Sequence, residues 1–158
     1  MPYTKDVFLS YTGLESDYAE TLYKDLTGYG ADVWFDKVDM PDGHNNDANV
    51  IRHHLRRALG ESRSLLLLVS GRALASRWVR FEMDTLIELE ARSSNRRITT
   101  LLVGQASMRD IPEAISGRKI HDLRDHFSAR YRRAREEIFR DVMTDFNLGR
   151  YRRIFDRE

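Results

Sequence analysis

The stretch Leu65-Leu66-Leu67-Leu68-Val69 is apolar at every position, without the apolar–polar alternation of a half-exposed strand. Such a run predicts a strand buried on both faces, as the central strands of parallel sheets are. On either side of it, short β-rich runs alternate with longer helical patterns. This order predicts a parallel sheet whose two faces are covered by helices.

The expected elements repeat as five βα units. The strands cover about Asp6–Ser10, Asp32–Phe35, Ser64–Ser70, Ile98–Val103 and Lys119–Leu123. The helices cover about Ser16–Thr27, Asn49–Gly60, Ser76–Ala91, Arg109–Ser116 and Ser128–Phe146. We therefore expect an α/β, flavodoxin-like three-layer sandwich with a five-stranded parallel sheet. Residues 1–148 form the expected domain, and residues 149–158 a tail that docks on it or leads to a partner.

Composition limits the class of protein. The 158 residues suit one domain, and their 41% hydrophobic and 32% charged fractions suit a soluble one. No apolar run approaches the ~20 residues of a membrane span, and the start lacks a secretory signal, so we expect a cytoplasmic protein without a membrane partner. The chain has no cysteine, which excludes thiolate metal sites, and its net charge of +1 gives no reason to expect nucleic acid.

The carboxyl ends of the expected strands define where a ligand would bind, because open parallel sheets bind ligands at that edge. Side chains with suitable chemistry fall there: Ser10 and Tyr11 after the first strand, Asp36 after the second, and the helix start from Arg77 to Glu82 after the third. The segment from Lys37 to Asn49, with Pro41, Gly43, three asparagines and three aspartates, is the one long loop. Such a loop in a compact domain is more often functional than idle.

Glu82 is the main candidate for chemistry. On a helix it lies about 40° from the apolar position Leu86 and about 60° from Val79, so it borders the buried face. Trp78 lies about 40° further round, which places an indole beside a carboxylate at the mouth of a cleft. The alternative is a half-exposed carboxylate on the helix shoulder with the tryptophan as rim packing.

Other patterns favour no site. His53 and His54 point about 100° apart on a helix and have no carboxylate pair at ligand spacing, so we expect no metal. Neither GxxxxGK[ST] nor GxGxxG occurs, which disfavours a nucleoside triphosphatase or a Rossmann dehydrogenase. The arginines between Arg130 and Arg135 are interleaved with acidic residues from Glu136 to Asp141, which is typical of a solvated helix face.

Four stretches together resemble the TIR domain family over about Asp6 to Phe146. Asp6-Val7-Phe8-Leu9-Ser10-Tyr11 is similar to its first signature box, and Val33-Trp34-Phe35-Asp36 with Met40 and Gly43 is similar to its second strand and BB loop. Ser76-Arg77-Trp78-Val79-Arg80-Phe81-Glu82 resembles the Ser-x-Trp-x-x-x-Glu pattern of enzymatic members, and Ile111-Pro112 also fits.

The resemblance implies an enzyme that cleaves NAD⁺ to nicotinamide and ADP-ribose or a cyclic isomer, in bacterial anti-phage immune signalling. Glu82 would be catalytic, and Ser10, Tyr11, Asp36, Gly43 and Trp78 would bind substrate, with no cofactor besides NAD⁺ itself. For Ser10 and Asp36, local capping of strand ends and turns is an equal alternative.

Two further readings stay open beside NAD⁺ cleavage. One is a non-catalytic module that pairs with itself or other TIR domains through the BB loop, and the other is a base-exchange reaction that uses the same glutamate. Asn45 departs from the aromatic residue that several TIR enzymes carry two positions after the loop glycine. This departure leaves open how the loop stacks on a base and which product forms.

Overall fold

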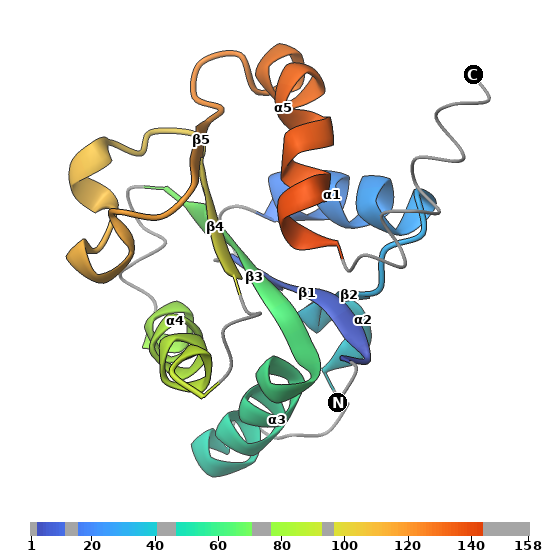
Figure 1. Ribbon diagram of the computed structural model, residues 1–158, viewed down its shortest axis with the longest axis vertical. Helices are drawn as coiled ribbons and strands as arrows, with labels where there is room; N and C mark the ends of the chain where they lie inside the picture. Colours follow the sequence, from blue (N-terminus) through green and yellow to red (C-terminus); the bar gives the residue numbers. More distant parts are fainter. Residues whose placement is uncertain (1–2, 12–15, 41–46, 71–76, 93–96, 144–158) are drawn as a thin grey trace.

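The computed structural model describes residues 3–11, 16–40, 47–70, 77–92 and 97–143 (Figure 1). The strands are β1 (Lys5–Ser10), β2 (Val33–Trp34), β3 (Ser62–Val69), β4 (Arg97–Leu102) and β5 (Ile120–Asp122). The α-helices are α1 (Ser16–Gly28), α2 (Asp36–Asp39), α3 (Ala48–Glu61), α4 (Arg77–Glu90) and α5 (Phe127–Val142), with 3₁₀ turns η3 (Met108–Asp110) and η4 (Glu113–Ile115). None of these helices has the length and apolar character to cross a bilayer.

The five strands form one sheet in the order β2-β1-β3-β4-β5, and every neighbouring pair is parallel. The chain therefore moves from β1 to one side for β2 and then crosses to the other side for β3. A topological switch point lies between β1 and β3, and open parallel sheets bind ligands at the carboxyl ends of the strands beside such a point. The predicted α/β sandwich with a five-stranded parallel sheet is confirmed.

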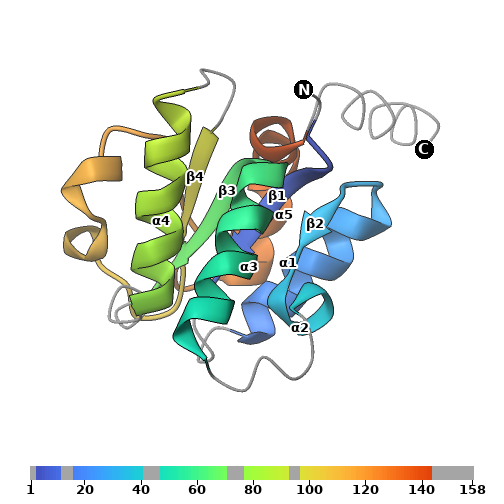
Figure 2. The same ribbon diagram turned by 90° about the horizontal axis from the view of Figure 1, so that it is seen from below.

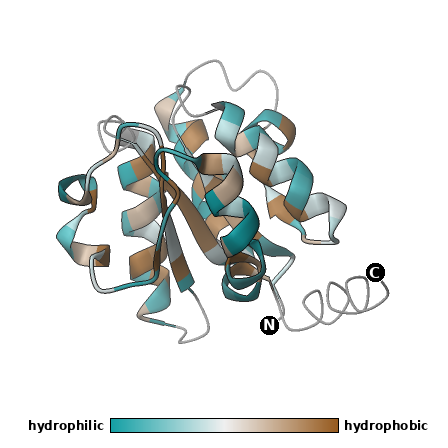
Figure 3. Cartoon of the chain, turned by 90° about the horizontal axis from the view of Figure 1, so that it is seen from above, coloured by the Kyte–Doolittle hydropathy of each residue, from teal (hydrophilic) through white to brown (hydrophobic). Residues whose placement is uncertain are grey.

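Helices cover both faces of the sheet, α1 and α5 on one and α3 and α4 on the other (Figures 1 and 2). Because successive side chains of a strand point to opposite faces, Val7 and Leu9 pack toward α1 and α5 while Phe8 packs toward α3. The whole run from Leu65 to Val69 is buried, as its pattern predicts. Figure 3 shows the same layering, with apolar residues gathered on the inner strands and hydrophilic ones on the outer helix faces.

The predicted helix at Arg109–Ser116 is wrong. The segment forms the two short turns η3 and η4, separated at Ile111 (φ −81°, ψ 122°) and Pro112 (φ −60°, ψ 142°). A proline disfavours the helical conformation in the residue before it and cannot donate a backbone hydrogen bond, so the helix stops there. Asp110 closes the first turn through a reciprocal capping box with Ser107.

The predicted long loop from Lys37 is wrong at its start, because α2 forms there. The Asp39 carboxylate accepts a hydrogen bond from the backbone N–H of Phe35 at 2.8 Å, which holds the turn closed. Pro41 and Gly43 lie outside the described residues. The loop ends at Asp47, whose side chain caps α3 by accepting the N–H of Asn49 at 2.9 Å.

The last helix is shorter than its apolar pattern predicts. It ends at Val142, because Met143 has an extended backbone (φ −84°, ψ 147°). The predicted tail of residues 149–158 lies outside the described residues, so its docking stays a prediction.

Candidate active site

The end of β1 sends two polar side chains to opposite faces of the sheet. Ser10 continues the face of Phe8 and reaches α4, whereas Tyr11 lies on the face of α1 and stacks on Phe35 with ring centroids 5.6 Å apart. Because side chains alternate along a strand, these two neighbouring residues each hydrogen-bond a different carboxylate.

The first carboxylate is that of Glu82, in the second turn of α4. The Ser10 hydroxyl donates a hydrogen bond of 2.5 Å to Glu82 Oε2, and the two residues are 1% and 8% exposed. Glu82 follows the buried Val79 and precedes the buried Met83 along the helix, so its side chain enters the core layer beside the end of β1. The alternative of a half-exposed carboxylate on the helix shoulder is therefore wrong.

The second carboxylate is that of Asp36, the first residue of α2. Its Oδ1 accepts a hydrogen bond of 2.6 Å from the Tyr11 hydroxyl and one of 2.9 Å from the backbone N–H of Lys37. Asp36 is exposed, in contrast to Glu82. Hydrogen bonds therefore connect the end of β1 both to the helix after β3 and to the helix after β2.

The two carboxylates lie in different electrostatic environments. Burial raises the pKa of Glu82 to about 8, the Ser10 hydrogen bond opposes that rise, and the negative charge of Asp36 adds to it. Burial and the hydrogen bond to Asp36 also raise the pKa of the Tyr11 hydroxyl. Among the described residues no lysine, arginine or histidine forms an ion pair with Glu82. A buried carboxylate of this kind is stabilised by any cation that reaches it.

The other predicted site residues are less fully defined. Trp78 is half-buried, packs against the core between α3 and α4, and meets Phe81 edge-on with ring centroids 6.3 Å apart. Its predicted contact with substrate stays a prediction. Gly43 lies outside the described residues. Within the described part of the chain, no group of three His, Asp or Glu side chains could hold a metal ion.

Sequence reasoning missed the bond between Tyr11 and Asp36. It predicts that both residues bind substrate, with local capping as the alternative for Asp36, and it does not predict that they contact each other. No local sequence pattern marks this contact, because it depends on β1 and β2 lying side by side, so that the residues that follow them meet at the same edge.

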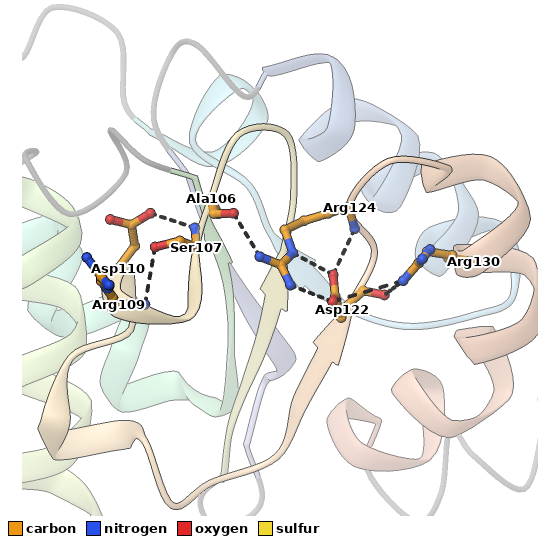
Figure 4. Close-up of polar contacts among 7 residues, drawn as sticks. All are labelled: Ala106, Ser107, Arg109, Asp110, Asp122, Arg124 and Arg130. Carbon is orange, nitrogen blue, oxygen red and sulfur yellow. Dashed lines mark hydrogen bonds and ion pairs between the residues drawn. The ribbon is translucent and has the colours of Figure 1, made fainter.

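A second polar cluster lies at the same edge, at the ends of β4 and β5 (Figure 4). Arg124 donates from Nε and Nη2 to the two carboxylate oxygens of Asp122 at 2.9 and 2.7 Å, and from Nη1 to the carbonyl oxygen of Ala106 at 3.1 Å. Arg130 lies 4.0 Å from the same carboxylate. These guanidinium groups lower the pKa of Asp122 to about 2, so this carboxylate is neutralised within the fold.

One curated relative is similar in sequence. The NAD(+) hydrolase PdTIR of Paracoccus denitrificans (strain Pd 1222) is 28% identical over 92 residues, which make up 58% of this chain. The match spans only 29% of that longer protein.

Solved structures share the fold. The TIR-STING receptor of C. gigas, solved in complex with 2′,3′-cGAMP, has a TM-score of 0.69 at 21% identity, covering 91% of this chain and 41% of that one. The TIR domain of the Toll-related receptor TRR-2 of Hydra magnipapillata has a TM-score of 0.66 at 16% identity, covering 88% of this chain and 98% of that one. A family model described as the TIR domain matches residues 7–138. The chain therefore belongs to the TIR domain family.

Proposed function

We propose that this chain cleaves the bond between nicotinamide and ribose in NAD⁺, with Glu82 as the catalytic residue. The observation that carries the proposal is a buried carboxylate at the switch point of the sheet, held by a neutral hydroxyl and lacking a basic partner among the described residues. The similarity to the NAD(+) hydrolase of Paracoccus denitrificans supports the choice of substrate.

The chemistry needs a fixed negative charge. When the glycosidic C–N bond breaks, its electron pair goes to the nicotinamide nitrogen, which becomes neutral, and the ribose becomes an oxocarbenium-like cation. A carboxylate beside that sugar stabilises the transition state more than the ground state, because the positive charge approaches it as the bond breaks. Water then captures the cation to give ADP-ribose and a proton, or an adenine nitrogen captures it to give a cyclic isomer.

Ionisation of Glu82 sets the pH dependence of this reaction. In the free protein the raised pKa keeps most of the carboxyl protonated at neutral pH. The pyridinium ring of bound NAD⁺ is an opposite charge and favours the carboxylate. We therefore expect kcat/KM, which reports the free enzyme, to rise with pH up to about 8. The midpoint for kcat lies at lower pH.

The remaining site residues complete the proposal. Ser10 orients Glu82, Tyr11 and Asp36 line the edge of the cleft, and Trp78 and Gly43 contact the substrate. The reaction would serve bacterial anti-phage immune signalling in the cytoplasm, after self-association through the loop that follows α2.

A second candidate is a non-catalytic module that binds other TIR domains. One feature favours it: α2 exposes the apolar side chain of Val38, which is 60% exposed, directly before the BB loop. Association without nicotinamide release, lost on Val38→Asp, would be its signature.

Incubation of the purified chain with NAD⁺, alone and on a scaffold that enforces oligomers, tests the enzymatic proposal. Resolving the products by mass should show nicotinamide with ADP-ribose or a cyclic isomer. Glu82→Gln should reduce release by at least about 100-fold. Glu88→Gln is the matched control, since Glu88 is on the same helix but exposed, beside Arg56. A wild-type chain that stays inert when oligomerised, or full activity in Glu82→Gln, would overturn the proposal.

A further inference from the structure

We propose that the amino edge of the sheet carries a second binding site, separate from the Glu82 site, for a small sugar phosphate. The site is a cavity of about 260 Å³ between the start of β4, the residues just before β5 and the end of α5. It is lined by Arg97, Ile98, Thr99, Arg118, Lys119 and Asp141. Its occupation does not depend on the proposed cleavage of NAD⁺.

The direction of the strands places this cavity at the opposite edge from Glu82. Arg97 is the first residue of β4 and Lys119 directly precedes β5, so both mark the amino ends of strands. Glu82 lies beside the end of β1, at the carboxyl ends. A strand of six residues, the length of β4, spans roughly 20 Å. A ligand in the cavity would therefore leave the Glu82 site free.

Two of the lining cations are held in place by acids that do not line the cavity. Arg118 donates from Nη1 and Nη2 to the two carboxylate oxygens of Glu90, the last residue of α4, and the Lys119 ammonium binds Glu137 of α5. Because α4 and α5 cover opposite faces of the sheet (Figure 1), these bonds fix two neighbouring cations between the two helices. Arginine and lysine carry more N–H donors than these bonds use, so both side chains can also bind an anion.

Arg97 supplies a positive charge that no ion pair balances. The charges of Arg118 and Lys119 are matched by Glu90 and Glu137, whereas Arg97 has no ion pair among the residues that the structure describes. Arg97 is also exposed, at the start of β4. A guanidinium group binds phosphate through paired, charge-assisted N–H bonds. The phosphate of a ligand would therefore lie against Arg97.

Asp141 favours a sugar phosphate over a bare anion. It is the acid among the six lining residues, and its Oδ2 lies 3.4 Å from Nε2 of the buried His121 of β5. A carboxylate repels a free phosphate ion but accepts hydrogen bonds from hydroxyl groups. The cavity is slightly smaller than the sites of drug-sized ligands, which limits the ligand to about the size of a pentose phosphate.

A purely structural role for these cations makes a different prediction. Cations near the carboxyl ends of α4 and α5 stabilise the helix dipoles, and the ion pairs of Arg118 and Lys119 fasten the start of β5 to both helices. That role needs no ligand, and it gives little weight to Arg97, which forms no ion pair within the described ranges. Arg97→Gln therefore separates the two roles: it should weaken ligand binding and leave the stability of the fold unchanged.

The test is titration of the full chain with ribose 5-phosphate, followed by calorimetry and by NMR of the backbone amide signals. We expect saturable binding that moves the signals of Thr99 and Lys119 but not that of Glu82. Arg97→Gln should weaken the affinity by about tenfold or more, because it removes charge-assisted hydrogen bonds to the phosphate. Arg140→Gln is the matched control, since Arg140 directly precedes Asp141 but is exposed, pairs with Glu136 and does not line the cavity. Urea unfolding checks that both variants keep the stability of the wild type.

Inorganic phosphate is the comparison ligand, and it should bind more weakly than ribose 5-phosphate. Asp141→Ala should weaken the binding of ribose 5-phosphate, which loses a hydroxyl acceptor, while inorganic phosphate binds no more weakly, because it loses a repulsion. Absence of saturable binding, equal affinity for inorganic phosphate, or an equal loss in Arg140→Gln would overturn the inference. Because the titration contains no NAD⁺, this result is separate from failure of the proposed reaction.

Discussion

Glu82 and Asp122 are both carboxylates at the carboxyl edge of the same sheet, yet their surroundings are opposite. Glu82 is buried, bonded to a neutral hydroxyl, and its pKa is raised to about 8. Asp122 is 40% exposed, held by the fork of Arg124 and approached by Arg130, and its pKa is lowered to about 2 (Figure 4). Position on the sheet does not decide the role of a carboxylate; its partners and its burial do.

The contrast separates a region of matched charges from the region of the proposed site. At β4 and β5 the charges are matched, and Arg124 also binds the carbonyl oxygen of Ala106, so the ends of two strands are tied together. At β1 and β3, the buried acid Glu82 has the Ser10 hydroxyl as its hydrogen-bond partner among the described residues, and burying an acid in this way costs folding free energy. A cationic ligand would recover that cost, and this is the physical basis of the proposed site.

The largest expected effect on stability comes from neutralising Glu82, the buried carboxylate of the two. Glu82 has a pKa of about 8 in the folded chain and 4.5 as its ordinary value, so between these values the folded state holds a proton that the unfolded state loses. The free energy of unfolding therefore falls as pH rises through this window. Above pH 8, Glu82→Gln should be more stable than the wild type by a few kcal/mol, as measured by urea unfolding.

The pH dependence is the control for that measurement. Below pH 4.5 both states protonate Glu82, so the stabilities of Glu82→Gln and the wild type should converge. A glutamine that destabilises the chain equally at every pH would show that packing outweighs the buried charge. In that case the buried charge of Glu82 would not be what lowers stability, and Glu82 and Asp122 would not differ in the way proposed.

The sequence predicts more of the fold than of the site. The run from Leu65 to Val69 and the βα alternation predict the sheet, because burial on both faces leaves a direct mark on composition. The helical periodicity also places Glu82 next to the buried face of its helix. It could not tell that Ser10 reaches this carboxylate, because that depends on β1 lying beside β3, a contact between residues 72 positions apart.

The errors have local causes. Arg109–Ser116 has helix-forming residues, and only Pro112 marks the break between η3 and η4. The sequence predicts a loop where α2 forms, because a helix of four residues is too short to show a periodicity. Asp36, which accepts the hydrogen bond of Tyr11, is the first residue of that same turn. Without predicting α2, the sequence could not predict this contact.

An intermediate effect is expected from the neutral partner of Glu82. Ser10→Ala removes the hydrogen bond that favours the ionised carboxyl, so the pKa of Glu82 should rise further. For the proposed reaction, kcat/KM at neutral pH should fall by about tenfold, and most of the loss should be recovered at high pH. Steady-state nicotinamide release across the pH range measures this.

Ser62→Ala is the matched control for Ser10→Ala. It removes another buried hydroxyl, which donates to the carbonyl oxygen of Ala58 at 2.7 Å at the other edge of the sheet. Its kcat/KM profile should keep the midpoint of the wild type. A loss in Ser10→Ala that is the same at every pH would mean that Ser10 acts by contacting substrate and not through Glu82.

The smallest effect is expected for Asp122, the carboxylate whose charge is matched by arginines. Asp122 has a pKa of about 2 in the folded chain against 3.8 ordinarily, so its contribution to stability is present above pH 3.8 and lost as pH falls through 2. Because the side chain is 40% exposed, water screens the pair, and Asp122→Asn should cost no more than about 1 kcal/mol at neutral pH. Urea unfolding should show this loss shrinking in acid, while nicotinamide release stays at the wild-type rate. A large loss of activity in Asp122→Asn would contradict this separation. It would mean that Asp122 belongs to the same site as Glu82 and that its charge acts on the substrate despite its arginine partners.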